Sequence, residues 1–226
     1  MALKVIVTGA TGMVGKGVLL ECLDHKEVSE VLSIGRRPVG LNHPKLKELI
    51  HQDFSEFDSV ADQLKGFDAC YACMGVSSVG MKEAEYKRKT YGYTLALAGT
   101  LSRLNPQMTF TYVSGQGTDS SEKGRQMWAR IKGKTENDLL KLGFRQAFMF
   151  RPGFIVPKRG VRPSSKLYSV LINSSGWLLK LIRKMAPGSV VDTVQVGRAM
   201  IRLTKSGYKK EIINPADIIE LSPARS

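Results

Sequence analysis

Residues 4–17 read KVIVTGATGMVGKG, and this stretch decides the fold. An apolar run typical of a buried strand leads into glycines in the pattern G-x-x-G-x-x-G, and a helix-like segment follows from residue 13. Glycines so placed permit a tight turn and let backbone N–H groups approach a diphosphate at the positive end of the helix. The stretch therefore predicts a dinucleotide-binding βα unit. The residues expected to contact the dinucleotide here are Gly9, Thr11, Gly12, Met13, Val14 and Gly15.

A phosphate-binding loop of the G-x-x-x-x-G-K-[ST] type is the competing interpretation, because Gly15 and Lys16 form the required Gly-Lys pair. Two positions argue against it. Ala10 replaces the first glycine of that loop, and Gly17 stands where a Ser or Thr would hold magnesium. The dinucleotide interpretation is therefore kept.

Apolar runs bounded by turn residues alternate with longer amphipathic stretches along the first two thirds of the chain. The expected strands are residues 4–9, 30–35, 48–53, 68–73, 109–115 and 146–153. The expected helices are residues 13–24, 56–65, 83–104 and 126–142. Buried strands that alternate with helices predict right-handed βαβ units, and hence an α/β doubly wound parallel sheet of the Rossmann type.

The length of 226 residues suits a single domain. Within it, residues 1–153 form the predicted dinucleotide-binding core, and residues 154–226 form a smaller, basic C-terminal portion on the substrate side. This portion is expected to begin with a loop and to continue with apolar residues at helical spacing from Leu167 to Met185. Residues 193–207 predict another helix, and residues 210–221 predict a strand with a turn.

The net charge of +14 is concentrated in the second half of the chain. Residues 111–226 hold 21 Lys and Arg against 8 Asp and Glu, and residues 139–191 contain no acid. Such a field favours an anionic partner, although solvated surface charge is the simpler alternative. A membrane surface bound through residues 158–187 is left open, but docking of that segment on the domain itself is favoured. Nucleic acid is not expected, because only the charge points to it.

The sequence predicts a cytoplasmic protein. The N-terminus runs directly into a strand pattern without a secretory signal, and apolar runs fall short of the roughly 18 residues that span a bilayer. Three cysteines argue against a disulfide framework and for a reducing compartment. Cys70 and Cys73 lie inside an expected strand, so we interpret them as small core residues. The three scattered histidines, His25, His43 and His51, predict no metal site.

Further motifs follow in order: IGRR at 34–37, CMG at 73–75, VSGQGTDSS at 113–121, KGKTE at 132–136, FRPG at 150–153 and VGRAM at 196–200. Together with the glycine loop they resemble the short-chain dehydrogenase/reductase superfamily over residues 3–205. The resemblance is greatest to its small atypical members, such as the Tat-interactive oxidoreductase-like and epimerase-like proteins. It implies a nicotinamide dinucleotide, and it implies further cofactor contacts at Asp53, Phe54, Met74, Gly75, Pro152 and Gly153.

Arg36 and Arg37 bear on which dinucleotide is bound. They stand at the end of the second expected strand, where an acidic residue would hold the ribose hydroxyls of NAD. Guanidinium groups suit a 2′-phosphate instead. NADP is therefore the favoured cofactor and NAD the second choice, with ordinary surface arginines as the alternative.

The resemblance also implies catalytic roles for Ser114 and for Lys132, which would additionally contact the cofactor. In the superfamily a Ser orients the substrate carbonyl, a Tyr exchanges the proton, and a Lys four residues later lowers the pKa of that Tyr. Here Trp128 stands at the tyrosine position, and no tyrosine occurs between Ser114 and Lys132.

Two functions are left open by this missing tyrosine. The first is an NADP(H)-dependent oxidoreductase or epimerase that acts on a small, anionic substrate, with the proton supplied by another tyrosine (Tyr91, Tyr93 or Tyr168) or by water held at Lys132. The second is a catalytically impaired module that binds NADP(H) for regulation or redox sensing. A homodimer is left open as well.

Overall fold

The computed structural model describes residues 2–162 and 188–223, which form a seven-stranded parallel sheet with the strand order β3-β2-β1-β4-β5-β6-β9. This is the doubly wound α/β order, and it confirms the predicted fold. The strands are β1 (Leu3–Thr8), β2 (Val28–Gly35), β3 (Leu46–Ile50), β4 (Ala69–Ala72), β5 (Thr109–Val113), β6 (Gln146–Phe150) and β9 (Ile212–Ile213). The order reverses between β1 and β4, where such sheets bind their ligands.

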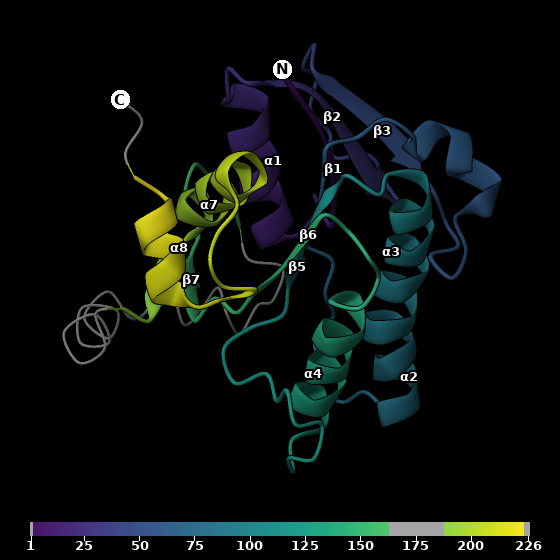
Figure 1. Ribbon diagram of the computed structural model, residues 1–226, viewed down its shortest axis with the longest axis vertical. Coiled ribbons are helices and arrows are strands. Elements are labelled where there is room, and N and C mark those ends of the chain that lie inside the picture. The colour runs from purple at the N-terminus through teal and green to yellow at the C-terminus, as the bar shows by residue number, and fades with distance from the viewer. Residues whose placement is uncertain (1, 163–187, 224–226) are drawn as a thin grey trace.

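Helices cover both faces of the sheet, as Figure 1 shows. One face carries α1 (Met13–Asp24), α7 (Thr193–Ser206) and α8 (Pro215–Leu221). The other carries α2 (Glu83–Lys87), α3 (Tyr93–Leu104) and α4 (Met127–Leu139). Because successive side chains of a strand point to opposite faces, Val5 and Val7 join the core under α1 while Ile6 joins the core under α3.

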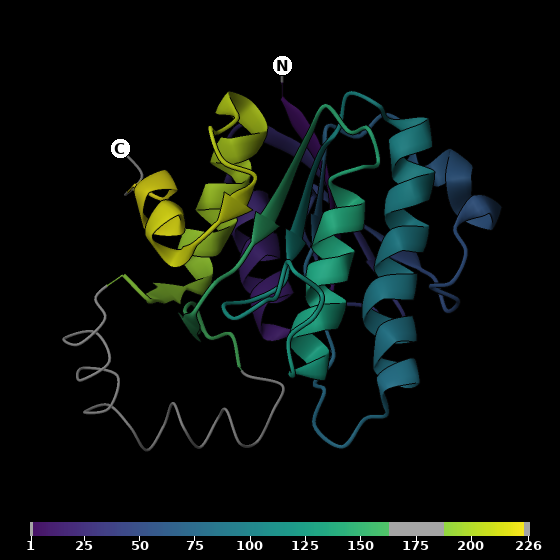
Figure 2. The same ribbon diagram turned by 60° about the horizontal axis from the view of Figure 1, so that its bottom comes forward.

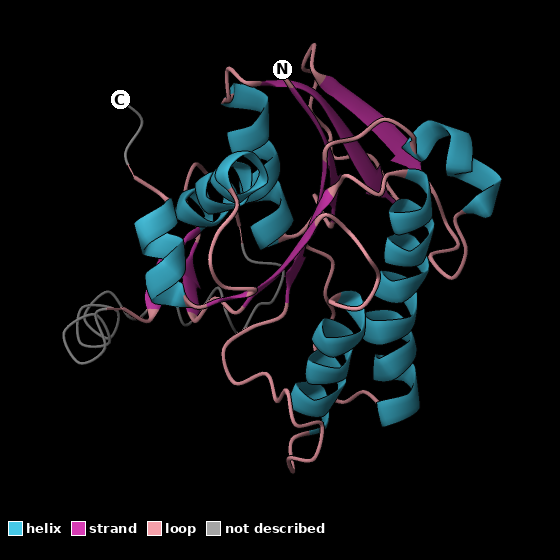
Figure 3. Cartoon of the chain, in the orientation of Figure 1, coloured by secondary structure: helices cyan, strands magenta, loops and turns pink. Residues whose placement is uncertain are grey.

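The segments that sequence periodicity placed in helices at 56–65 and 83–104 are helical but irregular. The first is a 3-10 helix, η1 (Asp58–Leu64), and the second is interrupted by a π-helical turn, η2 (Arg88–Gly92), between α2 and α3. Figure 3 shows the resulting long helical column beside α4. Residues 36–45 join β2 to β3 without a helix or strand.

Two expectations for the C-terminal portion are wrong. Residues 154–156 were expected in a loop, but β7 (Phe154–Val156) pairs with the distant β8 (Val190–Asp192) in a small parallel sheet. Residues 215–221 were expected in a strand and turn, but they form α8. Pro215 suits the first turn of a helix, and the Asp217 carboxylate accepts a hydrogen bond from the backbone N–H of Asn214 at 2.9 Å.

Because the sheet is parallel, the carboxyl ends of its strands lie on the same side, and Figure 2 shows α4 beginning on that side. The loops after β1, β2, β4 and β5 therefore meet there. Some predictions concern residues outside the described part of the chain. These are the helical segment from Leu167 to Met185, Tyr168, and most of segment 158–187. Within the described ranges, no helix is long and apolar enough to cross a membrane.

Candidate functional site

The glycine loop after β1 is packed so closely that side chains do not fit. Gly9 has φ +69°, and a Cβ atom there would lie 2.7 Å from the Cys73 carbonyl oxygen. A Cβ on Gly15 would lie 2.2 Å from the carbonyl oxygen of Gly9. The turn that brings β1 into α1 therefore requires glycine at both positions.

The same loop opens the positive end of α1 to a ligand. Gly12 is the N-cap of α1, and it has no side chain with which to accept hydrogen bonds from the first-turn N–H groups. These N–H groups and the helix dipole suit an anion such as a diphosphate. The chain thus provides the cradle that a dinucleotide needs.

A cavity of about 590 Å³ continues from this loop along the ends of β2 and β4. Eight of the predicted cofactor residues line it: Gly9, Thr11, Gly12, Arg36, Arg37, Phe54, Met74 and Gly75. The other residues that line it, which were not predicted to contact the cofactor, are Ile34, Gly35, Gln52, Cys73, Val76, Lys89, Tyr93 and Arg162. The Phe54 ring is buried and lies 6.2 Å from the Tyr93 ring, which gives the cavity an aromatic wall.

Seven predicted cofactor residues do not line this cavity: Met13, Val14, Gly15, Asp53, Lys132, Pro152 and Gly153. Met13 and Val14 pack against the core under α1, and Gly15 is buried in the turn. Asp53 is exposed, and its carboxylate accepts hydrogen bonds from the N–H and the hydroxyl of Ser55 at 2.9 and 2.5 Å. The Ser55 hydroxyl lowers the pKa of this carboxyl. Gln52, one residue earlier, lines the cavity in its place.

Ser114 follows β5 and is 5% exposed. Its hydroxyl oxygen lies 2.5 Å from a carboxylate oxygen of Glu136 and 3.0 Å from the Phe150 carbonyl oxygen. The hydroxyl therefore has partners inside the protein. To orient a substrate carbonyl, it would have to leave them.

Lys132 lies on α4 and is half-buried. Its amine donates a hydrogen bond to the backbone carbonyl of Ser114, at the carboxyl end of β5. Burial lowers the pKa of Lys132 to about 8, although the Glu136 carboxylate one helical turn later opposes the shift. Ser114 and Lys132, paired by the sequence analysis, thus lie in direct contact.

Glu136 is a fully buried carboxylate that sequence reasoning missed. Arg151, just after β6, grips it with two nitrogens: Nε lies 3.1 Å from both carboxylate oxygens, and Nη2 donates to one of them. A buried charge needs such pairing. The available signal was an acid four residues after Lys132, which places both on one face of α4.

Trp128 faces the loop that follows β5. Its indole ring would lie 3.2 Å from a Cβ atom on Gly117, so the loop has a glycine where the ring packs. The neighbouring Gln116 donates its backbone N–H to the Pro152 carbonyl at 3.0 Å, and its side-chain oxygen lies 2.6 Å from where a Cβ of Gly153 would be. The predicted residues Pro152 and Gly153 therefore lie against the 115–117 loop.

The cysteines near the site are not primed as nucleophiles. Burial raises the pKa of the Cys73 thiol to about 12 and raises that of Cys70 as well. Both remain protonated thiols near neutral pH, and the interpretation of Cys70 as a core residue agrees with its complete burial.

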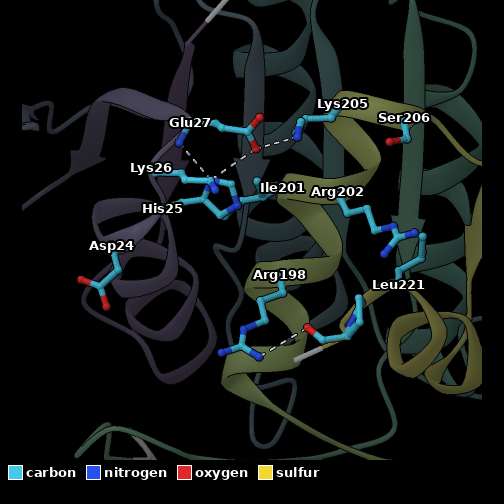
Figure 4. Close-up of a pocket in the computed structure, with 11 residues that line it drawn as sticks. Asp24, His25, Lys26, Glu27, Arg198, Ile201, Arg202, Lys205, Ser206 and Leu221 are labelled. Atoms are coloured by element: carbon cyan, nitrogen blue, oxygen red, sulfur yellow. Dashed lines mark hydrogen bonds and ion pairs between the residues drawn. The ribbon is translucent and has the colours of Figure 1, made fainter. Parts of the chain in front are cut away.

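A separate cavity of about 470 Å³ lies at the opposite end of the sheet, between the turn after α1 and the solvent face of α7 (Figure 4). In it Lys205 pairs with Glu27 at 2.5 Å, and the Arg198 side chain reaches the Pro223 carbonyl at 3.5 Å. Arg202 is an exposed member of its wall. This cavity shares no lining residue with the cavity at the glycine loop.

The sheet order and the glycine cradle define a nucleotide-binding α/β protein of the Rossmann class. Residues 5–124 match the model of the NAD dependent epimerase/dehydratase family, and the chain belongs to that family. Protein HTATIP2 of Rattus norvegicus is 28% identical over 201 residues, which cover 88% of this chain and 79% of that protein. The mitochondrial protein FMP52 of Candida albicans is 23% identical over 227 residues, covering 96% and 94%.

Solved structures share the fold. An oxidoreductase of the short-chain dehydrogenase/reductase family from Burkholderia thailandensis has a TM-score of 0.69 at 12% identity, covering 97% of this chain and 93% of that one. WbmF of Bordetella bronchiseptica in complex with NAD+ has a TM-score of 0.64 at 14% identity, and the match covers 96% of this chain and 76% of that one. A point variant of ElxO with NADPH bound has a TM-score of 0.67 at 13% identity, and the match covers 97% of this chain and 99% of that one. The predicted membership of the atypical short-chain dehydrogenase/reductase superfamily is confirmed.

The predicted cytoplasmic location is wrong. Fungal relatives from Candida albicans, Debaryomyces hansenii and Scheffersomyces stipitis are named mitochondrial proteins. The prediction relied on the odd number of cysteines, and free thiols separate reducing from oxidising compartments without saying which reducing compartment holds the protein.

Proposed function

We propose that this protein is an NADP(H)-dependent oxidoreductase or epimerase-like enzyme that acts on a small substrate with an anionic group. One observation carries the choice of NADP: Arg36 and Arg37 line the same cavity as the glycine loop, beyond the end of β2 where the adenosine ribose is expected. Guanidinium groups there suit a 2′-phosphate. A nicotinamide dinucleotide would supply a hydride to, or take one from, the substrate carbon.

The chain's own residues would serve two places along the carboxyl ends of the strands. The N–H groups after Gly12 would hold the diphosphate, and the aromatic wall of Phe54 and Tyr93 would flank the adenine. Lys132 and Ser114 stand at the other place, where the 115–117 loop meets Pro152. Positively charged Arg162 borders both the main cavity and an adjoining one of about 310 Å³ that also contains Lys16, so anionic groups have partners above the glycine loop.

The experiment is a fluorescence titration with NADPH and with NADH. We expect the Arg36→Ala, Arg37→Ala double variant to weaken NADPH binding by at least about tenfold, since even one charge-assisted hydrogen bond contributes about 1.5–3 kcal/mol. NADH binding should change little. Arg202→Ala, in the remote cavity, is the matched control. Equal affinities of the double variant and the control for NADPH would refute the NADP assignment.

A second function is favoured by Trp128, which occupies the tyrosine position and packs on Gly117. In that case the protein binds NADP(H) tightly as a regulatory or redox-sensing module. A panel of aldehydes, ketones and nucleotide sugars separates the two, because a sensor would bind NADPH without oxidising it in the presence of any of them.

A further inference from the structure

We propose that Lys132 itself exchanges the proton with the substrate oxygen, in the place of the missing tyrosine, and that Glu136 and Arg151 act as positioning residues for it. This inference rests on the proposed function and adds the identity of the acid–base group. In the superfamily that the sequence resembles, the lysine at this position only lowers the pKa of a tyrosine. Here the Lys132 amine would carry the exchanged proton itself.

The position of the amine is the first argument. The hydrogen bond from Lys132 to the Ser114 carbonyl holds Nζ at the carboxyl end of β5, where the sheet edge carries the site. The next residue is Gly115, and a Cβ atom there would lie 4.0 Å from Nζ. Gly115 therefore places no side-chain atoms against that side of the amine. Lys132 as a whole residue is half-buried.

The described hydroxyl groups of the region have other partners, are buried, or lie beside Phe54. The Tyr91 hydroxyl donates to the Asp138 carboxylate at 3.0 Å, and the Tyr93 ring faces Phe54 on the adenine side of the cavity. Tyr112 is 1% exposed, and burial raises its pKa. The Ser114 hydroxyl lies against Glu136. Within residues 2–162 and 188–223, Lys132 is therefore the best-placed proton donor.

The surroundings of the amine give it suitable acidity. A general acid works best when its pKa is near the working pH, and burial brings the pKa of Lys132 to about 8. Two charged groups face this corner: Glu136 from the same helix and Arg151 from the end of β6. Glu136 favours the ammonium form, but its charge is largely neutralised by the two-nitrogen grip of Arg151. The pair thus keeps Lys132 charged at neutral pH without restoring the pKa of an exposed lysine.

The proton transfer conserves atoms and charge. A bound dinucleotide would supply the hydride for the carbonyl carbon. In that direction an N–H bond of Lys132 would break and its proton would join the carbonyl oxygen. The neutral amine would then regain a proton from water. In the direction of alcohol oxidation the same amine, neutral, takes the hydroxyl proton.

The first test uses the protein without cofactor. Lysine labelling with a limiting acylating reagent over pH 6–11, read by mass spectrometry, gives the pKa of each amine. We expect Lys132 to titrate near 8, whereas Lys134, whose pKa is raised by its hydrogen bond to Asp138, serves as the reference in the same sample. A Lys132 that titrates with the ordinary value of about 10.4 overturns the proposal.

The second test follows NADPH oxidation. For reduction, kcat/KM should fall as pH rises through about 8, and Lys132→Met should lower it by about a hundredfold to ten-thousandfold. Glu136→Gln, checked for folding by circular dichroism, should move the pH midpoint downward, because a group that favours the ammonium form is lost. If folded Glu136→Gln protein keeps the pH midpoint of the unaltered protein, the positioning role of Glu136 is overturned.

The failures of the two ideas are distinguishable. Absence of NADPH binding refutes the proposed function, whatever Lys132 does. Binding without turnover of any substrate overturns proton transfer by Lys132 while leaving a binding module. Turnover that survives Lys132→Met overturns the role of Lys132 alone and leaves the enzyme.

Discussion

Gly15→Ala tests whether the glycine loop is as crowded as its geometry indicates. Both Gly15 in α1 and Gly99 in α3 are helical, so alanine at either position gains about 1 kcal/mol of helix propensity. A Cβ on Gly99 meets nothing within 4 Å, whereas one on Gly15 would lie 2.2 Å from the Gly9 carbonyl oxygen, against an ordinary contact of 3.4 Å or more. The contacting atom is backbone, so the turn itself must move by roughly 1 Å. Overpacking of this kind costs about 1–3 kcal/mol or more.

The two alanine variants should therefore diverge. We expect Gly99→Ala to raise Tm by about 2–4 °C and Gly15→Ala to lower it by up to about 8 °C, since 1 kcal/mol shifts Tm by about 2–4 °C at this size. The displaced turn should also cost at least one N–H bond to the diphosphate, which weakens NADPH binding by about ten- to a hundredfold. Differential scanning calorimetry and the NADPH titration measure both. A Gly15→Ala protein with unchanged Tm and unchanged affinity would refute the reasoning.

Two further predictions concern stability. The hydrogen bond from Lys134 lowers the pKa of Asp138 from 3.8 to about 2. Asp138 therefore contributes stability above pH 4 that is lost as pH falls toward 2. In urea unfolding, Asp138→Asn should lower the free energy of unfolding less at pH 3 than at pH 6. Asp217→Ala removes the acceptor of the Asn214 N–H at the start of α8 and should lower the free energy of unfolding by about 1–2 kcal/mol. Glu220→Ala, exposed on the same helix, should cost less; equal costs would contradict the capping argument.

The sequence predicted the sheet because each of its first six strands is a local apolar run next to a turn, and the glycine loop because its spacing is contiguous. Most of the missed features depend on partners distant in sequence. The strand β7 exists because residues 190–192 return to pair with it. Glu136 is buried because Arg151 reaches it from another element, and no spacing rule links the two. The helix α8 was missed for a local reason, since the apolar pairs of NPADIIEL also fit a strand.

The structure also changes what the basic half of the chain implies. Arg151 pairs its charge with Glu136, and Arg159 forms ion pairs with Glu21 and Asp24 on α1 at 2.9 and 2.7 Å. Glu21 is itself 2% exposed, so these contacts attach the segment after β7 to the core. Part of the acid-free interval is therefore balanced by acids from other parts of the chain.

Charge counted along a sequence consequently overstates the field that an anionic ligand meets. In the described part of the interval, Arg162 borders both the cavity along the ends of β2 and β4 and the neighbouring one with Lys16. The Lys16 amine donates to the Val39 carbonyl at 3.1 Å, so it is fixed beside the glycine loop rather than free on the surface. The residues after β7 thus attach to the core through the buried carboxylate of Glu21, and they place Arg162 in the wall of the cavity that continues from the glycine loop.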